Sequence, residues 1–253
     1  MEGGSALEGK KTVRAAERAL DILLCFTRQP TLSLTEISHM TELNKSTVYR
    51  LLATCEEKGF LIRDPDTDKY RLGFRVWELS ANLSRTDDMA VLFLQEMERL
   101  RDQIDETVSL YVRDGFERVR VQAVESLQAI RRVAPIGSRM PLAVGASSKV
   151  LAAFATPSDQ AMILGDPTWP ESVDRVSYLT QLQEIKKHGY ATSSEEREAG
   201  TSAIAVPVMN PNQEVVAALA VSGPVGRLTM ERMNEVAAPA LEAADRMGKM
   251  LKK

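Results

Sequence analysis

Apolar residues recur every three to four positions between residues 34 and 58, and short runs of β-forming residues then flank a turn up to Gly73. This order predicts a short helix, a tight connection, a second helix and a β-hairpin. One face of the second helix is apolar and carries Val48, Leu51, Leu52 and Cys55. The opposite face is short, polar and cationic and carries Ser46, Arg50 and Ala53. Together these elements predict a winged helix-turn-helix.

Capping residues define the ends of the two helices. Ser33 and Glu36 have the spacing of a capping box, which would start the first helix. Asn44 can cap the second helix with its side-chain oxygen, and Gly59 supplies a left-handed residue to end it. The hairpin, which is the wing of the motif, is expected to turn at residues 64–68 because this segment is rich in Asp and contains a proline.

A short polar face with one arginine suits the major groove of DNA. Small side chains allow close approach, and Arg50 can reach a guanine edge or a phosphate. The free N–H groups of the first helical turn and the outward cations of the wing would meet phosphate oxygens. The residues expected to contact DNA are Lys45, Ser46, Thr47, Tyr49, Arg50, Lys69 and Arg71. An isolated amphipathic helix is more often an ordinary solvated surface helix, but the neighbouring helix, turn and wing favour the DNA-binding interpretation.

Composition and periodicity divide the chain into four parts. Residues 1–10 are rich in Gly, Ser and Glu and are expected to form a disordered tail. Residues 11–73 form the winged helix-turn-helix domain, whose first helix is predicted over 13–26. Residues 74–88 are a linker with an apolar helix suited to dimer contacts, although packing within one chain explains its apolar residues nearly as well. Residues 89–253 form the second domain.

The second domain mixes period-two and helical patterns, which predicts an α+β fold. Its expected helices cover residues 89–104, 147–155, 178–187 and 229–251. Its expected strands cover residues 107–113 and 118–124, an apolar hairpin at 203–208 and 215–222, and one further strand within 129–135. The terminal helix is expected to cover the apolar hairpin.

The composition is that of an ordinary globular protein, with 253 residues of which 44% are hydrophobic and 26% charged. A net charge of −3 argues against indiscriminate binding to nucleic acid. DNA affinity would therefore rest on a few well-placed cations and on oligomerisation. No apolar run approaches the length of a membrane span and no secretion signal is visible, so we expect no membrane partner and a cytoplasmic location.

Few residues suggest chemistry of another kind. Cys25 and Cys55 fall at core positions of predicted helices, so we expect reduced, buried thiols rather than a redox pair. His39 and His188 lie far apart without ligand-spaced neighbours, so no metal site and no cofactor are expected. No nucleophile–base set or phosphate loop is visible, so we do not expect an enzyme. The alternatives to a DNA-binding regulator are a metabolite-binding enzyme or a protein-interaction module that uses the winged helix for docking.

Six motifs carry a wider resemblance, and they lie at residues 44–52, 70–73, 141–149, 189–200, 202–208 and 222–224. In their order and spacing they resemble the IclR family of bacterial transcriptional regulators, from Val13 to the C-terminus. The resemblance implies a winged helix-turn-helix joined by a helix to a GAF-like effector domain, with an antiparallel sheet flanked by helices. It also implies a homodimer or dimer of dimers on a palindromic operator, a small organic or aromatic effector, and repression as the commoner behaviour.

By position, the resemblance implies an effector site made of Gly145, Ala146, Ser147, Ser193, Ala203, Ala220 and Ser222. Backbone N–H groups at the helix start could take a carboxylate, and Ser222 could add a hydrogen bond. Ala143 stands where the family usually has histidine, and Ser193 where it often has an acidic residue. These differences favour an aromatic or amide-like effector. Close packing of sheet and helix is the alternative explanation for the small residues, and a solvated loop for the acidic run 195–198.

Overall fold

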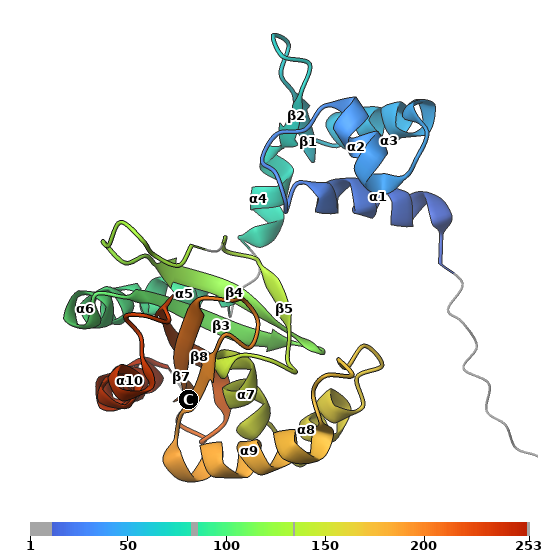
Figure 1. Cartoon of the computed structure of the whole chain (residues 1–253). Helices are drawn as coiled ribbons and strands as arrows, with labels where there is room; N and C mark the ends of the chain where they lie inside the picture. Colours follow the sequence, from blue (N-terminus) through green and yellow to red (C-terminus); the bar gives the residue numbers. More distant parts are fainter. Residues whose placement is uncertain (1–11, 82–85, 134, 252–253) are drawn as a thin grey trace, which may run out of the picture. The chain divides into compact units, whose positions relative to one another are not determined.

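The computed structural model describes residues 12–81, 86–133 and 135–251. The chain separates into two compact units, residues 1–83 and 84–253 (Figure 1). The tail expected at residues 1–10 lies outside the described residues. The two units have separate hydrophobic cores. The expectation of an α+β protein with an N-terminal helix-turn-helix and an antiparallel sheet flanked by helices is confirmed.

Three helices and a hairpin form the first unit. They are α1 (Arg14–Cys25), α2 (Leu34–Thr41), α3 (Lys45–Glu57), β1 (Leu61–Arg63) and β2 (Tyr70–Leu72). The predicted capping box is present, since Glu36 N–H donates to Ser33 Oγ and Ser33 N–H donates to the Glu36 carboxylate. The Asn44 side chain accepts the Thr47 N–H at 2.8 Å and starts α3, and left-handed Gly59 follows its end. The predicted ends of these helices are therefore confirmed.

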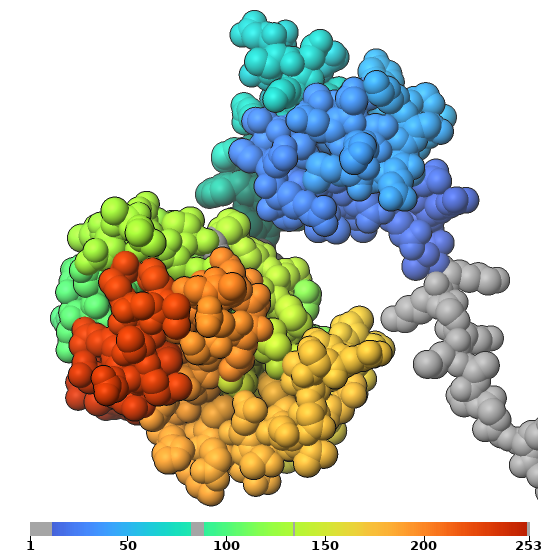
Figure 2. Space-filling model, viewed as in Figure 1, coloured from blue at the N-terminus to red at the C-terminus, as the bar shows by residue number. Residues whose placement is uncertain are grey.

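The core of the first unit joins the apolar faces of all three helices to the hairpin. Ile22, Ile37 and Leu52, one from each helix, are fully buried. This packing leaves the outer face of α3 in solvent. The turn between β1 and β2, drawn in cyan, protrudes from the body of the unit (Figure 2).

The helix α4 (Phe74–Ser80) carries apolar side chains that the rest of the first unit does not cover. Phe74, Trp77 and Leu79 are about 60% exposed, and the rings of Phe74 and Trp77 stack with their centroids 5.0 Å apart. Packing within the first unit therefore does not explain these residues. An apolar surface of this kind on a short helix is typical of a protein contact.

The second unit is a six-stranded antiparallel sheet between helices. Its strands are β3 (Thr107–Asp114), β4 (Glu117–Val124), β5 (Arg139–Pro141), β6 (Ala191–Ser194), β7 (Thr201–Met209) and β8 (Val215–Pro224). Their order across the sheet is β5-β4-β3-β8-β7-β6. The first strand of this unit, β3, thus pairs with the last, β8, and Thr107 lies opposite Ser222.

Helices cover both faces of this sheet. They are α5 (Thr86–Leu92), α6 (Leu94–Ile104), α7 (Ala146–Ala153), α8 (Pro157–Leu164), α9 (Arg175–His188) and α10 (Met230–Met250). Helices α6 and α10 pack on one face, as expected for the terminal helix, and α7 packs on the other face and contacts α8 and α9 (Figure 1). Gly248 brings α10 close to the backbone of Met209 at the end of β7.

Two predicted elements differ from the structure. The single helix expected over 89–104 is two helices, α5 and α6, because the chain turns at the fully buried Phe93. The strand expected within 129–135 is not formed by the described residues of that segment. Pro135 lacks an N–H donor and Gly137 has a φ of +83°, so the chain turns there and β5 takes the sheet edge instead.

Besides β5, two elements were not predicted. Helix α8 is preceded by Thr156, which caps it, and Pro157 occupies its first turn, so a helix-start signal was available. Strand β6 has the sequence Ala-Thr-Ser-Ser, which carries no alternation of apolar and polar residues.

None of the described helices is long and apolar enough to span a membrane. The described residues also contain no group of three or more His, Cys, Asp or Glu that could hold a metal ion.

Candidate functional site

A cavity lies between the sheet, the start of α7 and the segment that joins β6 to β7. All seven residues that the family resemblance associates with an effector line it, namely Gly145, Ala146, Ser147, Ser193, Ala203, Ala220 and Ser222. The free volume inside is about 50 Å³. This space holds a few water molecules but not an aromatic acid, so a ligand of that size must displace part of the wall.

Strand register explains why these small residues converge. Ser193 lies opposite Ala203, and Ala203 lies opposite Ser222, so three neighbouring strands present them to the same face of the sheet. Ala220, two residues before Ser222, lies on that face as well. Gly145 precedes α7 with a φ of +92°, and a Cβ atom there would be 3.0 Å from the Arg118 guanidinium. The cavity therefore has a wall of small side chains.

The structure adds a buried cation that sequence reasoning did not assign. Arg118 of β4 is only 4% exposed, and its Nη1 donates to the Val144 carbonyl at 2.7 Å. Its Nε has no partner in the described chain, and no described carboxylate lies within 4.0 Å of its guanidinium. Burial lowers the pKa of Arg118, but arginine remains charged at neutral pH. The alternation of Arg118 and Arg120 with valines in one strand was the signal available.

The acidic segment between β6 and β7 folds over this cavity. Glu196 Oε1 pairs with Lys149 Nζ at 2.5 Å, and Glu196 Oε2 accepts the Gly145 N–H at 3.0 Å. Glu198 forms an ion pair with Arg132, which also lines the cavity. The segment is exposed to solvent, but these ion pairs hold two of its side chains at the cavity.

The residues expected to contact DNA lie on α3 and on the wing. Lys45, Ser46, Tyr49 and Arg50 are exposed on α3, and Thr47 is half-buried. Lys69 and Arg71 are exposed on the wing. No described carboxylate lies within 4.0 Å of the cationic groups of Lys45, Arg50, Lys69 or Arg71. This surface therefore offers cations that intramolecular ion pairs do not neutralise.

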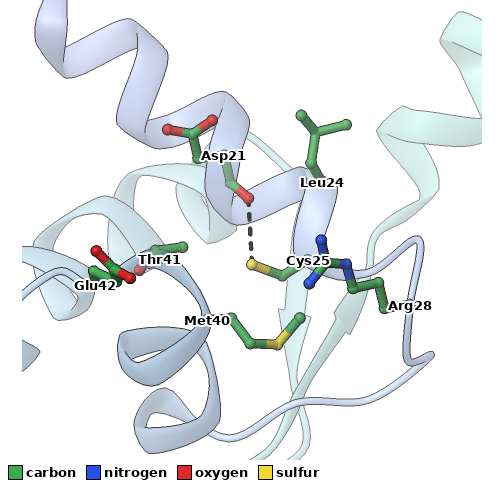
Figure 3. A pocket seen from close by; sticks show the side chains of 7 residues that line it. All are labelled: Asp21, Leu24, Cys25, Arg28, Met40, Thr41 and Glu42. Atoms are coloured by element: carbon green, nitrogen blue, oxygen red, sulfur yellow. Dashed lines mark hydrogen bonds between the residues drawn. The ribbon is translucent and has the colours of Figure 1, made fainter. Parts of the chain in front are cut away.

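A second hollow lies between α1 and the end of α2 (Figure 3). Cys25 Sγ donates a hydrogen bond to the Asp21 carbonyl at 3.3 Å, and Met40 lines the opposite wall. None of the residues predicted to bind DNA or effector lines this hollow. Cys25 and Cys55 are both free, and each is only 6% exposed.

Alkylation should be slow at both thiols in the native protein. Burial raises the pKa of Cys25 and of Cys55, so at pH 8 the reactive thiolate fraction is smaller than in a free cysteine. We expect intact mass after iodoacetamide treatment to show little adduct on the native protein and two adducts in denaturant. Rapid addition to the native protein would contradict burial as the controlling effect.

Two family matches cover most of the chain. Residues 15–65 match the IclR helix-turn-helix domain, and residues 82–248 match the bacterial transcriptional regulator IclR C-terminal domain. The chain belongs to the IclR family. This IclR-family protein is therefore a transcriptional regulator with a DNA-binding helix-turn-helix domain and an effector domain, and not an enzyme.

Similar proteins support this assignment along nearly the full length. HTH-type transcriptional regulator KdgR of Escherichia coli (strain K12) is 30% identical over 241 residues, 92% of this chain and 90% of KdgR. HTH-type transcriptional repressor AllR of the same strain is 31% identical over 229 residues, which cover 88% of this chain and 84% of AllR. An IclR homologue from Microbacterium hydrocarbonoxydans, solved with 4-hydroxybenzoate, shares the fold with a TM-score of 0.78 at 23% identity, covering 94% of this chain and 100% of that one.

Proposed function

We propose that this regulator is a repressor whose affinity for a palindromic operator changes when a small organic or aromatic metabolite binds in the cavity beside α7. One observation carries the proposal. The seven residues associated with an effector come from Gly145, the start of α7 and three strands, yet they line a single cavity that also contains the buried Arg118. The cavity is lined mostly by polar side chains, among them the cations Arg118, Arg132 and Arg197, which suits a small metabolite with an anionic or polar group.

DNA recognition is proposed to occur through α3. Arg50 would contact a base edge in the major groove, where a bidentate contact to guanine is the commonest specific pairing. Lys45, Ser46 and Thr47, at the start of the helix, would meet phosphate, and Tyr49 lies on the same exposed side. Lys69 and Arg71 of the wing would add contacts to the phosphate backbone.

A homodimer, or a dimer of two dimers, is proposed to place two copies of α3 on the two halves of the operator. The apolar face of α4, with Phe74, Trp77 and Leu79, supports a protein contact at this helix. A regulator that binds the bacterial chromosome works in the cytoplasm, which is the location we propose. AllR, a similar protein, is named a repressor, and this supports repression as the mode proposed here.

Trp77→Ser is expected to weaken the dimer. Trp77 is 60% exposed in the single chain, and burial of a tryptophan at an interface centre contributes about 2–4 kcal/mol. Sedimentation equilibrium should show the dimer dissociation constant rising by at least about thirtyfold, which corresponds to roughly 2 kcal/mol. Leu127→Ser is the matched control, since Leu127 is 79% exposed and lies in the second unit. Equal dissociation in both variants, or in neither, would contradict the role of α4.

The regulator proposal is tested with DNA from upstream of the protein's own gene. A mobility shift at fixed salt is run with and without small aromatic and aliphatic acids, amides and hydrazides, including 4-hydroxybenzoate because a protein of the same fold holds it. A specific shift released by one compound is the expected result. The absence of specific binding under every condition would contradict the proposal. A transcription reporter then distinguishes a repressor from an activator.

A further inference from the structure

The Glu196 carboxylate lines the cavity beside α7. It forms an ion pair with the Lys149 ammonium at 2.5 Å. It also accepts a hydrogen bond from the Gly145 N–H, which carries a partial positive charge, at 3.0 Å. Lys149 belongs to α7 and its side chain is 7% exposed, whereas Glu196 belongs to the segment between β6 and β7. Such charge-assisted hydrogen bonds are stronger than those between neutral groups.

The surroundings of this carboxylate hold more positive than negative charge. Arg118 lines the same cavity, almost fully buried, with its Nε unpartnered in the described chain. Because Gly145 has no side chain, the N-terminus of α7 is open to the cavity, and a side chain at this position would meet Arg118. The first turn of a helix favours an anion. The site therefore has the components of a carboxylate-binding site, and a side chain of the protein fills it.

We propose that Glu196 is an internal carboxylate ligand of this cavity, and that an effector binds by placing its own carboxylate where the Glu196 carboxylate lies. The inference rests on the proposed effector role of the cavity and deepens it. It selects the ligand class, because an anion restores both the ion pair with Lys149 and the hydrogen bond from the Gly145 N–H. It also sets the affinity, because Glu196 competes with the effector within the same molecule.

The shape of the cavity supports displacement. Its free volume of about 50 Å³ does not admit an aromatic acid while the acidic segment is docked. The segment 195–198 is the part of the wall held by side-chain ion pairs, through Glu196 to Lys149 and Glu198 to Arg132. A ligand carboxylate can exchange with these pairs without opening the hydrophobic core. Effector binding then moves this segment out of the cavity.

Titration calorimetry of the full-length protein tests the proposal with benzoate and acetate as carboxylates and with benzamide and acetamide as their neutral counterparts. Glu196→Gln removes the competing charge and keeps the shape of the side chain. We expect it to lower the dissociation constant of a carboxylate probe about tenfold, which corresponds to about 1.4 kcal/mol. In the same variant the carboxylate should bind better than its amide.

Glu195→Gln is the matched control. It makes the same charge change in the same segment, but the Glu195 carboxylate accepts the Gly200 N–H at 2.7 Å and does not line the cavity. We expect its affinity for benzoate to remain close to that of the unmodified protein. Circular dichroism and operator binding show whether each variant is folded. Because the substitution keeps the side-chain shape, a folded Glu196→Gln protein is expected.

Three results would overturn the proposal. They are weaker or equal carboxylate binding by Glu196→Gln, a preference of this variant for the amides, and no binding of either carboxylate at about 10 mM, which excludes even millimolar affinity. The mobility shift separates this inference from the regulator proposal. If an amide releases the operator while Glu196→Gln binds no carboxylate, the regulator proposal stands and the role of Glu196 does not.

Discussion

Arg50→Ala is expected to abolish most sequence-specific operator binding. Loss of a bidentate base contact costs about 1–3 kcal/mol, and a symmetric dimer loses the contact in both half-sites, so the total is about 2–6 kcal/mol. Mobility shifts at fixed salt should show affinity for the operator falling while affinity for unrelated DNA changes much less. The exposed side chain has no carboxylate partner in the described chain, so the fold should be unaffected.

Two control variants separate the reading of a base from general attraction to phosphate. Arg50→Lys keeps the charge but cannot make the bidentate contact to guanine. This variant should lose sequence specificity while keeping its affinity for unrelated DNA. Arg28→Ala removes an exposed cation from the first unit that is not expected to meet DNA, and it should change affinity little. If Arg28→Ala weakens operator binding as much as Arg50→Ala does, α3 is not the recognition helix.

Gly248→Ala is expected to destabilise the second unit. Alanine normally stabilises a helix interior relative to glycine by about 1 kcal/mol. Here the added Cβ would lie 2.2 Å from the Met209 carbonyl oxygen, so α10 must move away from β7. Overpacking of this kind costs about 1–3 kcal/mol and occasionally more, and because backbone is involved we expect a net loss of about 2 kcal/mol.

Urea unfolding measures this loss as a lower midpoint at an unchanged slope. Gly226→Ala is the matched control, because a Cβ atom there meets nothing within 4 Å. Its midpoint should stay within experimental error of that of the unmodified protein. An unchanged midpoint in Gly248→Ala would mean that the close approach of α10 to β7 is not needed for stability.

Local chemistry made the first unit predictable from sequence. The capping box of Ser33 and Glu36, the Asn44 cap and the left-handed Gly59 each act over three or four residues, so their spacing alone specifies a helix end. The strands of the second unit were predictable where apolar runs flank a turn, as in β7 and β8. Where a local signal is weak, as in the four polar residues of β6, partners distant in sequence decide the structure.

The charged part of the cavity could not be predicted for a similar reason. Lys149 and Glu196 are 47 positions apart, and their contact depends on how α7 and the β6–β7 segment meet. Arg118 could be assigned to a strand, but whether that strand faced a cavity depended on the order of the whole sheet. The small residues at the cavity wall were placed by resemblance to a family, which supplies such long-range information.

The pairing of β3 with β8 has a consequence for synthesis of the chain. Thr107 cannot meet Ser222 until residue 222 has left the ribosome, whereas the first unit is complete once β2 has emerged. The interval is about 150 residues, or roughly 8–30 s at bacterial elongation rates of about 5–20 residues per second. A message that ends early within this interval encodes the helix-turn-helix domain without β8, so its product lacks the strand that supplies Ala220 and Ser222 to the cavity wall.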